Sequence, residues 1–316
     1  MNDSGGQPLG FAHDAFFYSN EEGFAGAVVP WLREGLAQGQ AAVVATTRPH
    51  IELIGKELGG DAASVAFLLD DDWYVRPGRT IAGWHRTLHD LADQRFDYAR
   101  VICEVRFGSS DEERRSWTRF ESALNAAFAQ SDSWFVCPYD QRVLADTVLS
   151  DAWRTHPTAW DPSRRANDRY VDPATLLSEI HDSTPTTDGQ PVIDMPISDG
   201  LSDVRRAVRD RATQARMPQE RVEELVLAVS ETGANVVLHG AGQGRVILWI
   251  SEDRVVCEVT DQGEGLTDPL AGYLPPDQTA SRGMGLWLVR QLCDSIAIEP
   301  TEHGTTVRFS MDLERP

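Results

Sequence analysis

The stretch VEELVLAVSETGANVVLHG, from Val222 to Gly240, decides the fold of the C-terminal part of this 316-residue chain. Pro218 before it suits the first turn of a helix, and Gly240 suits its C-terminal end. Apolar residues recur at helical spacing and fall on one stripe, namely Val222, Leu225, Val226, Val229 and Val236. At about 100° per residue, Glu231 and Asn235 lie together on nearly the opposite face. We therefore expect a helix that packs on one side and lines a cleft with the other.

A Glu and an Asn four residues apart are also common on solvated helix surfaces, so this pair alone does not identify a site. Three further elements follow it in the chain. A predicted strand, Val255 to Thr260, ends in the sequence DQGEG, which begins at Asp261. The sequence RGMGL, which begins at Arg282, then opens an apolar helix, and Gly304-Thr305-Thr306 enters a last strand.

These four elements, in this order and spacing, resemble the nucleotide-binding motifs of the GHKL ATPase superfamily. That superfamily includes histidine kinases, Hsp90-type ATPases and anti-sigma-factor serine kinases. The resemblance implies ATP and Mg²⁺ as cofactors, with Asn235 as the residue that holds Mg²⁺. It also implies that Asp261 accepts a hydrogen bond from the adenine amino group, which favours adenine over guanine. Thr305 would then contact adenine through water.

The glycines of these motifs have implied roles as well. Gly263 and Gly265 would allow the backbone to approach the base closely. Gly283 and Gly285 would open a helix whose free amides and positive end face the phosphates. The segment between Leu266 and Arg282, rich in Pro, Asp and Gly, would form a lid over the nucleotide.

Glu231 is the catalytic candidate of the same resemblance. In the superfamily this position is a general base, acting on water in ATPases or on a substrate hydroxyl in serine kinases, and position alone does not separate the two. The surrounding sequence SETGAN and the short lid are most similar to the anti-sigma-factor kinases. A sensor histidine kinase is less well supported, because His156 and His181 lie in proline-broken sequence and not in a long dimerisation helix.

Composition narrows the function classes. The formal net charge is −20 and 41% of the residues are hydrophobic, so we expect a soluble, acidic, cytoplasmic protein that does not bind nucleic acid or membrane. No apolar run reaches the roughly 18 residues of a membrane span, and no secretory signal is evident. The four cysteines are predicted to be reduced. Cys103 and Cys137 could lie on neighbouring strands, which leaves a redox role open.

The first half of the chain alternates short apolar strands with helical runs, which predicts a largely parallel sheet covered on both faces. It lacks a phosphate-binding loop, because acidic residues occupy the turn after the first strand. Residues 11–155 resemble the MEDS sensory domain, through HDAFFY from His13, CEVR from Cys103 and CPYD from Cys137. The resemblance implies a RecA-like sensory fold.

Polar residues in this half are candidates for a ligand site or for turn chemistry. Asp70, Glu104 and Asp140 each follow a predicted strand, where open parallel sheets bind ligands. His85 and His89 are four residues apart on a helix and could chelate a metal, although no third ligand is evident. Four tryptophans could line an apolar pocket or pack in the core: Trp73, Trp84, Trp117 and Trp134.

Residues 156–190 are predicted to be a linker, because Pro, Thr, Asp and Ser cluster there, with a short helix from Pro173 to Ile180. Residues 191–316 are predicted to form the GHKL α/β sandwich, with helices on one face of a mostly antiparallel sheet. Its helix from Leu201 to Ala215 is rich in arginine, which suits either a solvated face or a docking surface for an acidic partner.

The sequence thus predicts a sensory domain that controls an ATP-binding serine kinase domain. The anti-sigma-factor resemblance implies a sigma factor and an anti-anti-sigma protein of the STAS type as partners, and suggests a homodimer. A non-catalytic module that binds partners in an ATP-dependent way is the main alternative, and an atypical sensor histidine kinase is the other.

Overall fold

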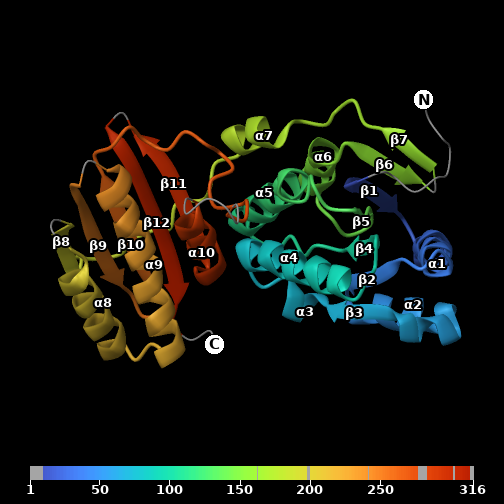
Figure 1. Cartoon of the computed structure of the whole chain (residues 1–316), viewed down its shortest axis with the longest axis horizontal. Coiled ribbons are helices and arrows are strands. Elements are labelled where there is room, and N and C mark those ends of the chain that lie inside the picture. The colour runs from blue at the N-terminus through green and yellow to red at the C-terminus, as the bar shows by residue number, and fades with distance from the viewer. Residues whose placement is uncertain are drawn as a thin grey trace. The chain divides into compact units, whose positions relative to one another are not determined.

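The computed structural model describes residues 10–161, 163–197, 200–240, 242–276, 283–301 and 303–313 (Figure 1). The chain divides into two compact units, with the boundary between Ile180 and His181. Each unit contains its own sheet. Within the described ranges, no helix combines the length and the apolar character that crossing a bilayer requires.

The first unit is built on a sheet with the strand order β3-β2-β4-β5-β1-β6-β7. Every pairing in it is parallel except the one between β6 and β7. This arrangement confirms the predicted parallel sheet. The strands are β1 (Ala12–Tyr18), β2 (Ala41–Thr46), β3 (Val65–Leu69), β4 (Ala99–Cys103), β5 (Ser133–Asp140), β6 (Thr158–Asp161) and β7 (Ser163–Ala166).

Helices cover both faces of this sheet, which explains why its central strands are apolar at almost every position. In β2, for example, Val44 packs in a core with Phe24 and Leu32 of α1, whereas Val43 faces the other side and is equally buried. On that other side, Trp84 of α4 packs edge-on against Phe135 of β5 at 5.3 Å. The helices are α1 (Glu21–Ala37), α2 (Arg48–Leu58), the 3₁₀ turn η1 (Gly59–Ser64), α3 (Asp70–Trp73), α4 (Pro77–Asp93), α5 (Asp111–Ala127), α6 (Asp146–Thr155) and α7 (Pro173–Glu179).

The segment predicted as a linker, residues 156–190, contains ordered elements of the first unit. β6 pairs in parallel with β1, and β7 folds back on β6 to extend the sheet. α7, which matches the predicted short helix, presents carbonyl oxygens to the buried Arg119 of α5. Composition did not reveal the hairpin, because each of its strands has only four residues.

The second unit is an antiparallel sheet with the strand order β11-β12-β10-β9-β8. Figure 1 shows α8, α9 and α10 on one side of this sheet, which confirms the predicted α/β sandwich. The predicted hairpin at Glu252-Asp253 joins β9 to β10. The elements are β8 (Ile193–Ile197), α8 (Ser202–Gln214), α9 (Gln219–His239), β9 (Gly244–Ile250), β10 (Arg254–Asp261), α10 (Met284–Leu292), β11 (Ser295–Thr301) and β12 (Gly304–Asp312).

Helix α9 lies at the centre of the second unit. Its predicted apolar stripe is buried, with Val222, Leu225 and Val229 fully covered, and it packs against β8, β9, β10 and β12 as well as the helices α8 and α10. Pro218 occupies the N-cap and Gly240 the C-cap, so the helix begins and ends where the sequence predicts. Fixing this helix by its buried face orients its opposite face, which carries the polar pair.

Candidate nucleotide-binding site

The polar face of α9 presents Glu231 and Asn235 one turn apart, and both side chains are half-buried. Their neighbours on the helix include Ser230, whose hydroxyl donates to the carbonyl of Val226 and accepts from Arg205 of α8. Thr232, on the buried side, donates to the carbonyl of Ala228. These hydroxyls are therefore engaged with backbone carbonyls or arginine, which distinguishes them from the acid and the amide of this face.

The N-terminus of α10 lies directly against this pair. A Cβ atom placed on Gly285 would lie 3.1 Å from Glu231 Oε2 and 3.4 Å from Asn235 Nδ2. Gly283, the N-cap, has φ of +93°, a left-handed conformation that glycine adopts without strain. The absence of a side chain at Gly285 lets the backbone of this helix start lie close to the acid and the amide. The first amides of a helix have no partner within it, and a helix start therefore attracts anions.

A tight turn after β10 holds the carboxylate of Asp261. Its Oδ1 accepts hydrogen bonds from the backbone amides of Gly263, at 2.8 Å, and Thr305, at 3.2 Å. Within the described ranges, the second oxygen, Oδ2, accepts no hydrogen bond from the protein. The Thr305 hydroxyl, in turn, accepts from the amide of Leu266 at 3.0 Å. The structure thus brings Asp261, Gly263 and Thr305 together and fixes one edge of the carboxylate.

Close backbone contacts join this turn to the end of α9. A Cβ on Gly263 would lie 2.3 Å from the carbonyl oxygen of His239, and one on Gly240 would lie 2.5 Å from the Cβ of Asp261. Gly265, with φ of +80°, faces the carbonyl of Gly304 in the β11–β12 turn. The helix that carries the polar pair and the turn that carries Asp261 are therefore packed together without intervening side chains.

Two of these contacts involve glycines to which the sequence analysis assigned no site role. Gly240 entered only as a helix stop and Gly304 only as part of a motif, yet both contact Asp261. The spacing of glycines around the Asp261 motif was the available signal. This spacing indicates where the chain has small residues, but it does not indicate which other backbone segment packs against each glycine.

The described part of the predicted lid, residues 266–276, is anchored on α10. Gly272, with φ of +76°, lies against the carbonyl of Leu286, where a Cβ would be 2.8 Å from the oxygen. The guanidinium of Arg290 lies 4.1 Å from the ring centre of the buried Tyr273 and donates to the carbonyl of Ala271. The rest of the predicted lid, residues 277–282, which includes Arg282, lies outside the described residues.

Replacing Gly304 by alanine should lower the thermal unfolding midpoint of the second unit by several degrees and weaken nucleotide binding. Gly304 has φ of +138°, and its new Cβ would lie 2.1 Å from the carbonyl oxygen of Asp261, so the turn that holds this carboxylate must move. Gly242→Ala is the matched control, because Gly242 also has a positive φ, +70°, but has nothing within 4 Å of the Cβ position. Calorimetric melting of both variants checks this, and equal melting shifts would contradict it.

In the first unit, two of the three strand-end carboxylates, Glu104 and Asp140, belong to a network of ion pairs and hydrogen bonds. Glu104 accepts from the Tyr18 hydroxyl at 3.0 Å and contacts His50 Nδ1 at 2.7 Å. Asp140 pairs with Arg142, which also reaches Glu21 at 2.7 Å. Asp70 lies apart from this network and pairs with Arg106 at 3.6 Å. Mutual pairing accounts for these carboxylates without a ligand.

The stability of this network should depend on pH through His50. Burial opposes its charged form, but hydrogen bonds and charge interactions with Glu104 and Glu21 outweigh burial and raise the pKa of His50 above 6.5. When the pKa of a histidine is higher in the folded state than in the unfolded state, its protonation stabilises the fold. This stabilisation is complete at pH values below the unfolded-state pKa and is lost as the pH rises through the folded-state pKa. The thermal midpoint of wild type should therefore exceed that of His50→Gln at about pH 6, by a margin that shrinks toward about pH 9. If the difference in thermal midpoint between wild type and His50→Gln does not change with pH, protonation of His50 is not the source of the stabilisation.

The remaining candidates in the first unit are the histidine pair and the tryptophans, and each of these side chains either packs in the core or lies at the surface. His89 is largely exposed and pairs with Asp93 at 3.7 Å, whereas His85 stacks on Phe128 at 4.2 Å, and burial lowers the pKa of His85 to about 4. Because the two side chains have separate surroundings, the structure does not support a metal site shared by this pair. The tryptophans pack with other aromatic rings, as Trp73 does with Trp84 at 4.7 Å. All four cysteines are buried thiols and not halves of disulfides.

Comparison with known families gives two separate matches. Residues 12–157 match the family described as the methanogen/methylotroph, DcmR sensory domain, abbreviated MEDS. Residues 198–311 match the family described as the histidine kinase-like ATPase domain. The chain therefore carries a MEDS domain at its N-terminus and a histidine kinase-like ATPase domain at its C-terminus.

Individual relatives align with the C-terminal domain. The chain is similar to a serine-protein kinase RsbW of Bacillus licheniformis, with 29% identity over 125 residues, covering 35% of this chain and 78% of the relative. RsbW of Bacillus subtilis (strain 168) is 27% identical over 123 residues, covering 35% and 76%. An anti-sigma F factor of Thermoanaerobacter sp. (strain X514) is 29% identical over 122 residues, covering 36% and 85%.

Proposed function

We propose that this chain is a cytoplasmic signalling regulator whose C-terminal domain binds Mg²⁺ and ATP and acts as a protein serine kinase of the anti-sigma-factor type. The observation that carries the proposal is the approach of the start of α10 to the acid and amide of α9, with Gly285 against both Glu231 and Asn235. An acid, an amide and a helix start with free amides suit the transfer of a phosphoryl group.

The Asp261 turn suits recognition of adenine. Because Gly263 and Thr305 hold Oδ1 with their amides, the carboxylate is fixed before any ligand arrives. The remaining oxygen can accept a hydrogen bond from the amino group of adenine, whereas the carbonyl of guanine offers only an acceptor there. Gly263 and Gly265 let this turn pack closely against the backbone of His239 and Gly304, which supports a carboxylate held in one position. Preorganisation of this kind lowers the cost of binding.

Asn235 and the start of α10 suit the phosphates. The amide oxygen of Asn235 is a hard ligand of the type that Mg²⁺ accepts. Mg²⁺ would neutralise part of the phosphate charge, which matters in a chain whose formal net charge is −20. Gly283 and Gly285 leave the amides of the helix start accessible to phosphate oxygens. In this scheme ATP supplies the phosphoryl group, and the residues of the chain position it.

Glu231 is the proposed general base. Its carboxylate would accept the proton of a serine hydroxyl on the partner protein while that oxygen attacks the terminal phosphorus, and ADP would leave with the electron pair of the broken bond. The closeness of its carboxylate to Gly285, at the start of the helix proposed to hold the phosphates, supports this role. The competing scheme keeps nucleotide binding but gives Glu231 no chemical role, so ATP would only set the shape of a binding module.

The partners follow from the relatives and not from the geometry. The similarity to serine-protein kinases and to an anti-sigma factor supports a sigma factor as the bound partner and a STAS-type anti-anti-sigma protein as the phosphorylated one. The MEDS domain would be the sensory input, and a homodimer would form through the kinase domain. The arginines of α8 are a candidate contact for an acidic partner, although Arg206 and Arg209 also pair with acids of this unit.

The proposal is tested by mixing the full chain with labelled ATP, Mg²⁺ and candidate anti-anti-sigma proteins. We expect acid-stable phosphate on a serine of the partner. Tight ATP binding in calorimetry without transfer to any partner would favour the non-catalytic module instead. Acid-labile phosphate on the chain itself would favour a histidine kinase. If calorimetry detects no heat of binding with Mg²⁺ and ATP, the serine kinase, the ATP-dependent binding module and the histidine kinase are all rejected.

A further inference from the structure

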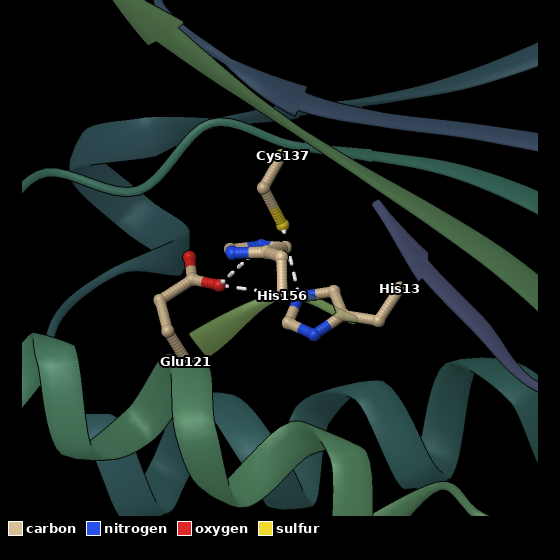
Figure 2. A group of neighbouring side chains, drawn as sticks. All are labelled: His13, Glu121, Cys137 and His156. Carbon is tan, nitrogen blue, oxygen red and sulfur yellow. Dashed lines mark hydrogen bonds and ion pairs between the residues drawn. The ribbon is translucent and has the colours of Figure 1, made fainter. Parts of the chain in front are cut away.

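Four side chains of the MEDS domain converge on one buried point (Figure 2). They are His13, Glu121, Cys137 and His156, and one atom of each lies within 4.8 Å of the corresponding atoms of the others. Figure 2 shows all four pointing toward one another. All four residues are at most 1% exposed. Such a concentration of polar atoms in a core requires an explanation, because burying unsatisfied polar groups is costly.

Four different elements deliver these side chains. His13 is on β1, Cys137 on β5, Glu121 on α5, and His156 directly follows α6 at its C-cap. β1 and β5 are neighbours with Ala15 opposite Cys137, which brings the first histidine and the thiol together. The sequence analysis placed His156 in a linker and Cys137 among the reduced cysteines, so the cluster was not predicted.

Hydrogen bonds on the far side of each imidazole fix its tautomer. His156 Nδ1 lies 2.9 Å from the carbonyl oxygen of Ala152, which can only accept, so Nδ1 carries a proton. In the neutral ring, Nε2 then has a lone pair. That nitrogen lies 3.3 Å from Glu121 Oε2, another lone-pair atom.

His13 has the same arrangement. Its Nδ1 lies 3.2 Å from Asn125 Oδ1, and the amide nitrogen of Asn125 donates to the carbonyls of Ser122 and Thr155, so Oδ1 is the acceptor. The Nε2 lone pair of His13 is therefore directed at Glu121 Oε2 and Cys137 Sγ, both at 3.2 Å. In metal sites, ligating histidines almost always donate their other ring nitrogen to a carbonyl or carboxylate in this way.

Some polar atoms of the cluster lack a hydrogen-bond partner in the described part of the chain. Within the described ranges, neither carboxylate oxygen of Glu121 has a hydrogen-bond partner, and His156 Nε2 has none either. Four atoms with lone pairs that face one another need either protons or a cation between them. A carboxylate and a thiolate together carry two negative charges, which match a divalent cation and leave the buried site neutral.

The separations suit a small tetrahedral ion. Zn²⁺ with bonds of about 2.0 to 2.3 Å holds its nitrogen, oxygen and sulfur ligands roughly 3.3 to 3.6 Å apart. The contacts of 3.2 and 3.3 Å between the imidazole nitrogens and Glu121 approach that spacing. They exceed the roughly 2.7 to 2.9 Å of a charge-assisted hydrogen bond.

We propose that His13, Glu121, Cys137 and His156 form a four-coordinate site for a divalent transition metal ion, specifically Zn²⁺, in the core of the MEDS domain. Two imidazoles with one thiolate and one carboxylate are a ligand set of intermediate softness that suits Zn²⁺ better than Mg²⁺ or Cu⁺. Metal binding releases the thiol proton of Cys137 to solvent. With four protein ligands the site is closed, as in structural zinc sites.

The test uses the full chain, stripped with a chelator and titrated with Zn²⁺ or Co²⁺ alone. We expect one ion per chain by elemental analysis, and with Co²⁺ the d–d bands of a tetrahedral ion together with a thiolate-to-metal charge-transfer band. Cys137→Ser should abolish the charge-transfer band, and Glu121→Gln should weaken binding while keeping the side-chain size. Asn125→Ala retains all four ligands and should weaken binding by about 10- to 100-fold through loss of imidazole positioning.

Two control variants test whether the Co²⁺ spectrum arises from this cluster and not from another part of the chain. Cys257→Ser removes an equally buried thiol from β10 of the ATPase domain and should leave the Co²⁺ spectrum unchanged. Asn235→Ala should do the same, because the proposed Mg²⁺ ligand lies in the other unit. Circular dichroism verifies that each variant is folded. A wild-type chain that binds neither ion, or a folded Cys137→Ser variant that keeps the charge-transfer band, would overturn the proposal in favour of a proton-linked network.

Discussion

Replacing Asp261 by asparagine is expected to weaken ATP binding by about 10- to 100-fold and to shift the nucleotide preference toward GTP. Asparagine can keep Oδ1 as the acceptor for the amides of Gly263 and Thr305, so the turn should persist. The outward group then becomes an amide that donates, facing the amino group of adenine, which also donates. The carbonyl of guanine becomes the better match at that position.

Calorimetric titration of the variant and the wild type with ATP and GTP, each with Mg²⁺, measures this effect. Asp253→Asn is the matched control, because Asp253 is an exposed aspartate in the hairpin before the same strand. The control should bind both nucleotides as the wild type does. Unchanged ATP affinity in folded Asp261→Asn would show that this carboxylate does not contact the base.

Replacing Glu231 by glutamine is expected to lower the rate of phosphate transfer by about 10²- to 10⁴-fold and to change ATP affinity only a few-fold. Glutamine preserves the size of the side chain beside Gly285, so the packing at the start of α10 is retained. It cannot accept the proton of an attacking hydroxyl. The loss should therefore appear in the rate constant for transfer and not in the binding of ATP.

Glu220→Gln is the control for this experiment, since Glu220 is an exposed acid in the first turn of the same helix. Transfer to the partner protein and ATP affinity are measured for both variants. If Glu231→Gln transfers phosphate as fast as Glu220→Gln, the carboxylate is not the base. If both transfer and ATP binding fail together, the side chain acts in nucleotide binding and not as a proton acceptor.

Much of the second unit was predictable because its elements have strong local patterns. The apolar stripe of α9 repeats at helical period, and its members Val222, Leu225 and Val229 are fully covered in the structure. The hairpin at Glu252-Asp253 has polar turn residues between apolar strands. The motif after β10 required resemblance to a known family, because a carboxylate followed by glycines has no unique local meaning.

Other features escaped prediction because they depend on contacts between distant segments. Gly304 contacts Asp261, although the two lie on different strands and are far apart in the chain. The β6–β7 hairpin joins the sheet through β1, at the other end of the first unit's sequence. A short strand with an ordinary composition gives no signal until its partner is known.

By itself the sequence determined the alternation of strands and helices in the first unit, the helix of the second unit that carries Glu231 and Asn235, and the order of the motifs that follow this helix. These features follow from the spacing of apolar and polar residues along a few turns or a single strand. Only the tertiary structure decided that His13, Glu121, Cys137 and His156 meet in one buried cluster. Their convergence depends on which strands are neighbours and how α5 and α6 pack on the sheet, and strand order is a property of the whole domain that no local spacing encodes.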